Sequence, residues 1–187
     1  MQCMAEQSKM VALGSTAPDF ALPDTASGRI VTLEEFADSP ALLVAFLCNH
    51  CPYVKHVLEG FVSFAREYGP RGLAVVAISA NDAENYPDDA PPEMAKLAKA
   101  KQFPFPYLYD ESQAIAVAYG AVCTPDFFLF DRARHLAYRG QFDSSRPRSA
   151  TAVTGADLRA AADAVLQGRP PSTEQLASVG CSIKWRD

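Results

Sequence analysis

Two apolar runs separated by an amphipathic stretch constrain the fold of this chain more than any other feature. The runs cover residues 41–47 and 73–79, and neither contains a charged side chain. Short runs of this kind are typical of strands buried on both faces of a sheet. Between them, residues 53–68 carry apolar side chains at helical spacing, and Gly69-Pro70 is a helix stop signal. Strand, helix and strand in this order predict a right-handed βαβ unit.

Shorter elements are predicted on both sides of this unit. Extended runs at 19–24 and 29–33 flank a turn-rich segment and predict a β-hairpin, and the strands predicted at 126–130 and 135–139 form a second hairpin. The sequence therefore predicts an α/β fold with a central mixed sheet flanked by helices and an N-terminal β-hairpin. The other predictions are a helical turn at 33–36, helices at 93–101, 112–119 (with Ser112 as N-cap) and 155–167, a strand at 107–109, a solvated acidic loop at 80–92 and a polar loop at 141–154.

Length, composition and charge limit the class of protein. A chain of 187 residues with 49% hydrophobic residues can bury one core, so we expect a single domain over 15–187 with an irregular tail at 168–187. Residues 1–14 lack the apolar core of a signal peptide and are predicted to be an unstructured lead. The net charge of −5 argues against nucleic-acid binding, and no apolar run is long enough for a membrane span. We therefore predict a cytoplasmic protein and leave its oligomeric state open.

Two cysteines, Cys48 and Cys51, lie where the strand at 41–47 ends and the next helix begins. A thiolate at a helix N-terminus faces unpaired backbone N–H groups and the positive end of the helix dipole. Both effects lower the pKa of a cysteine and make its sulfur nucleophilic. Five cysteines, an odd number, argue against a framework of structural disulfides, so the pair is predicted to be redox-active or to bind a metal.

Several motifs resemble the thioredoxin-like superfamily. Asp19-Phe20-x-Leu22-x-Asp24 with Gly28-x-x-Val31-x-Leu33 is similar to the N-terminal hairpin of the redoxin (AhpC/TSA, peroxiredoxin-like) branch. Thr124-Pro125 resembles the cis-proline loop that lies beside the active site in this superfamily. The segments 49–54 and 180–185 are similar to a bacterial group of peroxiredoxin-like proteins with a CxxC pair. The resemblance covers about residues 15–187 and implies a thioredoxin-like fold.

The resemblance also implies a site and an activity. Cys48 would be the exposed, attacking thiol of a thiol–disulfide oxidoreductase, and Cys51 the resolving thiol. His50, if protonated, would stabilise a thiolate, and Asn49 and Pro52 complete the motif. The Thr124-Pro125 loop would present its backbone to a substrate. The implied partners are protein or small-molecule disulfides and thiols, or peroxides, with thioredoxin or glutathione as reductant, and no cofactor is expected.

A thiol peroxidase with an antioxidant role is the first alternative, with Cys51 as peroxidatic cysteine and Cys48 or Cys181 as resolving cysteine. Peroxiredoxins have the pattern Pro-x-x-x-Thr-x-x-Cys. Aligning Cys51 with its cysteine places Cys48 at the threonine position and Val44 at the proline position. The activating arginine would fall close to Pro125. These departures favour disulfide exchange.

The remaining cysteines and histidines leave further alternatives open. Cys123 and Cys181 are candidate additional redox thiols, although a small buried residue is the favoured interpretation of Cys123. Cys3 is predicted to be a bystander. A metal-binding or redox-sensing module without turnover would combine Cys48, Cys51, Cys123 and either His50 or His56. Only the spacing of the first two is typical of zinc, so no metal is expected.

Overall fold

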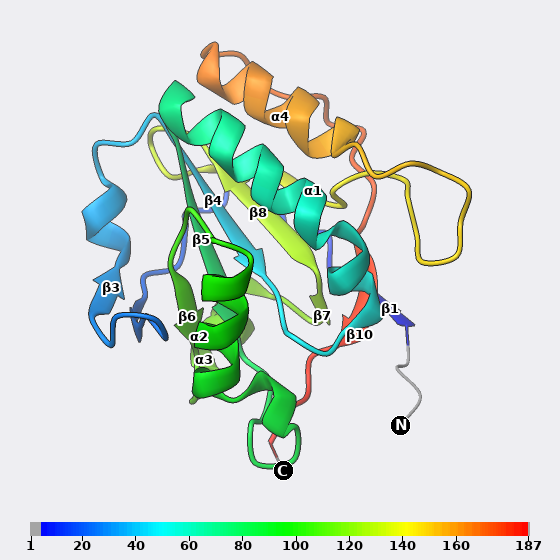
Figure 1. The fold of residues 1–187 in the computed structure, drawn as a ribbon. Coiled ribbons are helices and arrows are strands. Elements are labelled where there is room, and N and C mark those ends of the chain that lie inside the picture. The colour runs from blue at the N-terminus through cyan, green and yellow to red at the C-terminus, as the bar shows by residue number, and fades with distance from the viewer. Residues whose placement is uncertain (1–4, 187) are drawn as a thin grey trace.

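The computed structural model describes residues 5–186, and a mixed sheet of five strands lies at the centre of these residues (Figure 1). The strand order is β6-β5-β4-β8-β9. β4 is parallel to β5 and β8 is antiparallel to β9, as the sequence predicted. In addition, β5 is parallel to β6 and β8 is antiparallel to β4. The bounds are β4 (Ala41–Phe46), β5 (Leu73–Ser79), β6 (Tyr107–Tyr109), β8 (Asp126–Phe130) and β9 (Leu136–Gly140).

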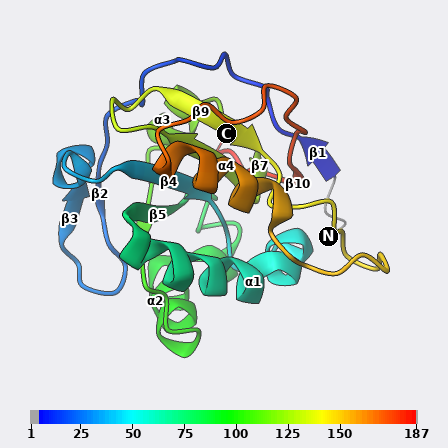
Figure 2. The same ribbon diagram turned by 90° about the horizontal axis from the view of Figure 1, so that it is seen from above.

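Helices cover the two faces of this sheet unequally. The helices α1 (Pro52–Tyr68), α2 (Pro91–Ala100) and α4 (Ala156–Leu166) pack on one face, where α1 and α4 lie side by side (Figure 2). The short helix α3 (Ala114–Tyr119) packs on the other face. Because side chains alternate along a strand, Leu43 of β4 faces the first core and Val44 faces the second. The central strand is thus buried on both faces, which explains its continuous apolar sequence.

A second, three-stranded sheet joins the two ends of the chain and corrects two predictions. Its order is β1 (Ala5–Gln7), β10 (Val179–Ser182) and β7 (Cys123–Thr124). The predictions of an unstructured lead over 1–14 and an irregular tail over 168–187 are wrong for the residues of β1 and β10. These strands are short and pair with partners far along the chain, so no local sequence pattern predicts them. The prediction for Cys3 lies outside the described residues.

The N-terminal hairpin and the short helices follow the predictions with one exception. The hairpin consists of β2 (Ala21–Pro23) and β3 (Ile30–Thr32). The predicted N-cap Ser112 is wrong, because α3 begins only at Ala114 and follows Gln113 in a left-handed conformation. The carboxylate of Asp110 instead accepts a hydrogen bond from the backbone N–H of Ala116, at 2.9 Å. The 3₁₀ turns are η1 (Leu33–Phe36), η2 (Gly69–Arg71) and η3 (Pro87–Asp89).

Within residues 5–186, no helix combines the length and the apolar character that crossing a membrane requires.

Candidate active site

The two cysteines of the CxxC pair lie at the carboxyl end of the central strand β4. Cys51 is the N-cap of α1, and Pro52 occupies the first helical position, where its missing N–H and fixed φ are well tolerated. Both cysteines are buried, with exposed fractions of 1% for Cys48 and 0% for Cys51. The prediction that Cys48 is the exposed thiol is therefore wrong. Thr124 of β7 (Cys123–Thr124) and Cys181 of β10 lie against the two sulfurs, which the sequence of the motif alone does not reveal.

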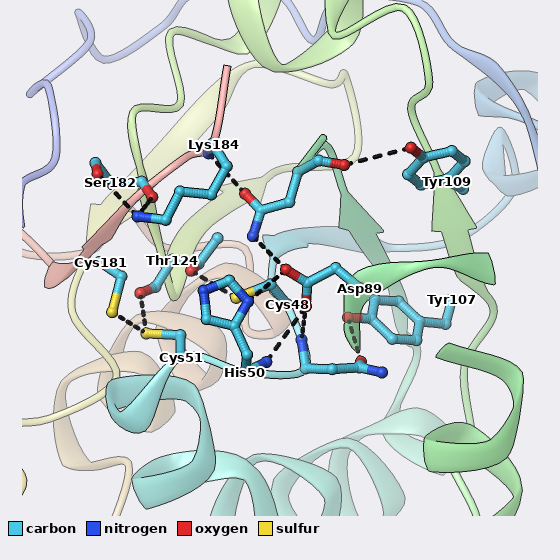
Figure 3. A network of polar contacts seen from close by, with 12 residues as sticks. Cys48, His50, Cys51, Asp89, Tyr107, Tyr109, Thr124, Cys181, Ser182 and Lys184 are labelled. Atoms are coloured by element: carbon cyan, nitrogen blue, oxygen red, sulfur yellow. Dashed lines mark hydrogen bonds and ion pairs between the residues drawn. The ribbon is translucent and has the colours of Figure 1, made fainter. Parts of the chain in front are cut away.

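The loop before β8 contacts both sulfurs through one residue. The Thr124–Pro125 peptide bond is cis, as predicted. Thr124 Oγ1 lies 3.2 Å from Cys48 Sγ, and the carbonyl oxygen of Thr124 lies 3.2 Å from Cys51 Sγ, as a hydrogen-bond acceptor (Figure 3). Thr124 thus faces both thiols, and the predicted supporting pair Thr124 and Pro125 lies beside the CxxC motif.

The two thiols differ in acidity. A hydrogen bond from the Cys48 thiol lowers the pKa of Cys51 to about 6, and the backbone N–H groups of Val54, Cys181 and Tyr53 lower it further, against the opposing effect of burial. The same hydrogen bond and burial raise the pKa of Cys48 well above its ordinary value. Because the thiolate is the nucleophile, this asymmetry favours Cys51 over Cys48 as the attacking thiol. The sequence analysis assigned the attack to Cys48, and that assignment stays a prediction.

A buried carboxylate that the sequence analysis assigned to a solvated loop anchors the motif from the other side. Asp89 has an exposed fraction of 0%. Its Oδ1 accepts hydrogen bonds from the backbone N–H groups of Asn49 (2.7 Å) and His50 (3.3 Å). Its Oδ2 accepts from His50 Nδ1 (2.5 Å) and Asn81 Nδ2 (2.8 Å), as Figure 3 shows. Both oxygens are therefore fully used in holding the loop between the cysteines.

Asp89 and His50 shift each other's pKa in opposite directions. The hydrogen bond to Asp89 raises the pKa of His50, and the negative charge of Cys51 raises it further. Burial alone would raise the pKa of Asp89, but the hydrogen bonds from His50 and Asn81 hold it below its ordinary value. His50 is thus favoured as an imidazolium next to the pair. Nothing in the sequence distinguishes Asp89 from the neighbouring acidic residues, because its role depends on a contact across 39 residues.

The side chains of His50 and Asn49 have further partners. The His50 ring stacks on Tyr86 with 5.5 Å between ring centroids and 12° between planes. Asn49 Oδ1 accepts a hydrogen bond of 3.2 Å from the Tyr107 hydroxyl. These contacts fix the two residues that separate the cysteines, so the predicted supporting role of His50 and Asn49 has a structural basis.

The other candidate thiols lie at different distances from the pair. Cys181 Sγ lies 2.8 Å from Cys51 Sγ. Cys123 is buried, burial raises its thiol pKa, and its sulfur lies 4.0 Å from the carbonyl oxygen of Pro125. Of the two, Cys181 is the one in contact with the pair, and its sulfur is already part of a disulfide.

The predicted metal-ligand set does not assemble as proposed. His56 Nε2 lies 3.0 Å from Ser145 Oγ instead of joining the cysteines. Cys48, His50 and Asp89 do place one ligand atom each within 4.8 Å of one another. However, the Asp89 carboxylate already accepts four hydrogen bonds, one of them from His50 Nδ1. A cation would have to displace these donors, so the donor set fits a metal poorly.

The fold and the thiol site define a thioredoxin-like protein, and comparison with known proteins gives its family. Residues 13–139 match the AhpC/TSA family, and the chain belongs to this family. This confirms the redoxin resemblance and the fold class, and it supports a thiol-based oxidoreductase function in general. Comparison with curated proteins gave no match.

Three solved structures are similar to this chain over most of its length. An uncharacterized conserved protein from Geobacillus kaustophilus has 50% identity and a TM-score of 0.97, covering 100% of this chain and 98% of its own. A hypothetical protein from Sinorhizobium meliloti 1021 has 54% identity and a TM-score of 0.95, covering 96% and 98%. The peroxidoxin BcpB from Mycobacterium tuberculosis, with 21% identity, a TM-score of 0.61 and coverage of 83% and 96%, shares the fold.

Proposed function

We propose that the protein is a thiol–disulfide oxidoreductase in which Cys51 attacks and Cys48 resolves. The observation that carries this proposal is the position of Cys51 at the N-cap of α1, with Cys48 hydrogen-bonded to its sulfur. A thiolate placed there is stabilised by the helix N-terminus and by the neighbouring thiol. The donor thiol is at the same time the group that must attack next.

The reaction proceeds in two exchanges. The Cys51 thiolate attacks one sulfur of a substrate disulfide, a mixed disulfide forms, and the other substrate sulfur leaves as a thiolate that takes up a proton. Cys48 then loses its proton and attacks Cys51 Sγ. The Cys48–Cys51 bond forms, the mixed disulfide breaks, and the second substrate thiolate leaves. The dithiol has been oxidised by two electrons and the substrate disulfide reduced to two thiols.

His50 and Asp89 supply a route for the protons. The charge of the Cys51 thiolate helps to raise the pKa of His50. When the mixed disulfide removes that charge, the pKa of His50 falls, so the imidazolium can protonate the leaving thiolate. The neutral imidazole can then accept the proton of Cys48. Asp89 keeps the ring oriented through its bond to Nδ1.

The reaction needs thiol and disulfide partners and no cofactor. We expect thioredoxin or glutathione to regenerate the dithiol, and a cytoplasmic location is part of the proposal.

The test is a redox titration of the pair in glutathione buffers, with mass spectrometry of alkylated peptides. We expect a reversible Cys48–Cys51 disulfide with a potential between about −120 and −270 mV. Cys51→Ser and Cys48→Ser should each abolish the Cys48–Cys51 couple, and the control Cys123→Ala should keep it. If no Cys48–Cys51 disulfide forms at any poise, the proposal is wrong.

A thiol peroxidase is the second candidate, and the burial of both sulfurs favours it. With exposed fractions of 0% and 1%, the pair is more accessible to a small oxidant than to a protein disulfide unless the site opens. Hydrogen peroxide consumption by Cys48→Ser separates the two functions. A one-cysteine peroxidase at Cys51 keeps its rate with an added thiol reductant, whereas the proposed exchange enzyme shows no comparable peroxide turnover.

A further inference from the structure

Lys184, in the C-terminal segment that follows β10, carries a positive charge that no carboxylate neutralises. Its Nζ donates to the carbonyl oxygen of Ser182 at 3.0 Å and to Ser182 Oγ at 3.2 Å (Figure 3). Both acceptors are uncharged, and Lys184 takes part in no ion pair within residues 5–186. The ammonium group is therefore available to an anion from outside the chain.

The alternation of side chains along this segment turns the lysine outward. Cys181 and Ile183 are buried, whereas Ser182 and Lys184 are partly exposed. In an extended backbone, successive side chains point to opposite faces, so Ser182 and Lys184 share the outer face. The contact between them lies on the solvent side of the segment.

The backbone of Lys184 is fixed by the polar network that also holds the CxxC loop. Its N–H donates to Asn81 Oδ1 at 2.9 Å, and its carbonyl oxygen accepts from the N–H of Asp82 at 2.9 Å and from Gln113 Nε2 at 2.8 Å. Asn81 in turn donates to Asp89, which binds the backbone of the loop between the cysteines. Lys184 is thus positioned relative to the thiol pair before any ligand arrives, which lowers the entropic cost of binding.

One aromatic ring links Lys184 with His50. The Tyr86 ring stacks on the His50 imidazole, and Lys184 Nζ lies 5.8 Å from the centroid of the same ring. All three side chains are partly exposed. The charge of Lys184 opposes protonation of His50, but the hydrogen bond to Asp89 outweighs it and raises the pKa of His50. Two cationic groups therefore lie at partly exposed positions beside the buried pair.

The acidic residues nearby leave this positive charge uncompensated. Asp89 is buried, and its two oxygens accept four hydrogen bonds from the motif and Asn81. Asp82 Oδ1 lies 3.6 Å from Arg186 Nε. Glu84 and Asp88 are exposed and form no ion pair with Lys184. The rim formed by His50, Tyr86 and Lys184 thus favours an anionic ligand.

We propose that Lys184, together with His50, selects small disulfides that carry a carboxylate near each sulfur. This inference rests on the proposed function and deepens it by naming the substrate class. The substrate is small because both sulfurs of the pair are buried, which leaves a folded protein disulfide little access. It is a carboxylate because that anion accepts charge-assisted hydrogen bonds from an ammonium and an imidazolium.

The exchange stays balanced with such a substrate. The Cys51 thiolate forms a bond to one substrate sulfur, the substrate disulfide breaks, and the other half leaves as a thiolate that takes up a proton. Cys48 then loses its proton and attacks Cys51 Sγ, the Cys48–Cys51 bond forms, and the second half leaves. A thiolate alone repels an anionic disulfide, so the two cations reverse the preference that the reacting sulfur would otherwise have.

Three small disulfides of similar size and different charge test this selection. They are the anionic 3,3′-dithiodipropionate, the neutral bis(2-hydroxyethyl) disulfide and the cationic cystamine. The reduced, full-length protein is mixed with each at neutral pH and low ionic strength, quenched with acid, alkylated and digested, and the Cys48–Cys51 disulfide is measured by mass spectrometry. We expect the anionic disulfide to react faster than the neutral one and the cationic disulfide to react most slowly. Added salt should reduce these differences.

Variants of Lys184 assign the selection to its charge. Lys184→Gln should lower the rate constant for dithiodipropionate about five- to tenfold and change that for the neutral disulfide by less than about twofold. Lys184→Arg keeps the cation and should retain most of the selectivity. Lys99→Gln, at an exposed position of α2, makes the same change in net charge and should behave like the wild type.

Several outcomes would overturn the selection. One is a wild-type ratio of anionic to neutral rate constants at or below one, which needs no variant and decides the question even if Lys184→Gln is unstable. Others are an equal loss for all three disulfides in Lys184→Gln, and the same selective loss in Lys99→Gln. The wild type also keeps the two proposals apart. If none of the disulfides produces a Cys48–Cys51 bond, the function and the selection both fail, whereas a bond that forms at a rate independent of substrate charge refutes only the selection.

Discussion

Individual side chains decide which sulfur of the pair carries the negative charge. Cys48 is a donor to Cys51, and burial and that hydrogen bond raise the pKa of Cys48. The helix N-terminus stabilises the charge only at Cys51, the N-cap residue. Cys48, three residues before Cys51, therefore has a different role, although both are buried cysteines of one motif.

Replacing Cys48 tests this dependence with a matched pair of variants. Cys48→Ala removes the donor and should raise the pKa of Cys51 from about 6 toward its ordinary value. Cys48→Ser keeps a hydroxyl donor and should leave the pKa closer to the wild-type value. Thiolate ultraviolet absorbance against pH, with Cys51→Ser as the reference, measures the titration. If the pKa of the Cys51 thiol is the same in both variants as in the wild type, the backbone amides of α1 alone set this pKa.

Asp89 is the residue whose removal should change the pH dependence of folding. The pKa of His50 is raised by its interaction with Asp89. The stabilisation that His50 gives the fold is therefore fully present below the ordinary histidine pKa and is lost as pH rises through the raised value. The pKa of Asp89 is lowered, so the stabilisation that Asp89 gives the fold is fully present above the ordinary carboxylate pKa and is lost as pH falls through the lowered value. The window in which both contribute lies between about pH 4 and pH 6.5.

We expect Asp89→Asn to destabilise the protein by about 1–3 kcal/mol, near the lower end because the His50 ring is partly exposed to solvent. Denaturant unfolding at several pH values should show the largest loss within that window and a smaller one at alkaline pH. Asp88→Asn, at the exposed neighbouring position, is the matched control. A loss that does not vary with pH would mean that only the neutral hydrogen bonds of Asp89 matter.

Among the secondary-structure elements, β10 contributes to the site although it lies far from the motif in sequence. It pairs with β1 on one side and with β7 on the other, next to the cis-proline loop. Its backbone can approach that loop only because residue 180 has no side chain. Strand and loop therefore position Cys181 together.

Gly180→Ala tests the role of this close approach. The new Cβ would meet backbone atoms of Thr124 and Pro125, which cannot move aside as a flexible side chain could. We expect a loss of stability of at least about 1–3 kcal/mol and a rise in the pKa of Cys51, since the Cys181 N–H moves away. Gly69→Ala is the control, because its Cβ would have no neighbour within 4 Å. Equal melting temperatures and thiolate titrations of the two variants would refute the role of Gly180.

The molecule as a whole links its redox state to its stability. The pKa of Cys51 is about 6 in the folded protein and near 9 without the fold. A lowered pKa stabilises the reduced protein above the ordinary cysteine pKa, and this contribution is lost as pH falls through about 6. At pH 7 it amounts to about 1 kcal/mol.

We therefore expect the gap in melting temperature between reduced and oxidised protein to change with pH. The reduced form should gain stability relative to the oxidised form as pH rises from about 6 to about 9. Thermal denaturation of both forms over this range measures the gap, and Cys51→Ser, which forms neither the thiolate nor the disulfide, shows how stability varies with pH without either. A gap that stays constant across the range would contradict a thiolate at Cys51.

The main elements of the fold could be predicted because their signals are local. The apolar run of β4, the amphipathic face of α1 and Pro52 lie within a few residues of one another, and they place Cys51 at a helix N-terminus. The resemblance to the redoxin branch added the cis form of Pro125. Ser112 was wrong as an N-cap because Gln113, in a left-handed conformation, takes that position. Ser112 Oγ accepts from the N–H of Ala114, and Asp110 Oδ2 accepts from that of Ala116.

The sequence by itself determined the strand–helix junction that carries two cysteines, and with it the class of chemistry. Only the tertiary structure decided which cysteine is acidic, that Asp89 anchors His50, and that Cys181 meets Cys51. These contacts join residues 39 and 130 positions apart. Caps and periodic faces depend on neighbours along the chain, whereas the burial and charge that set a pKa depend on segments that meet only when the sheet has formed.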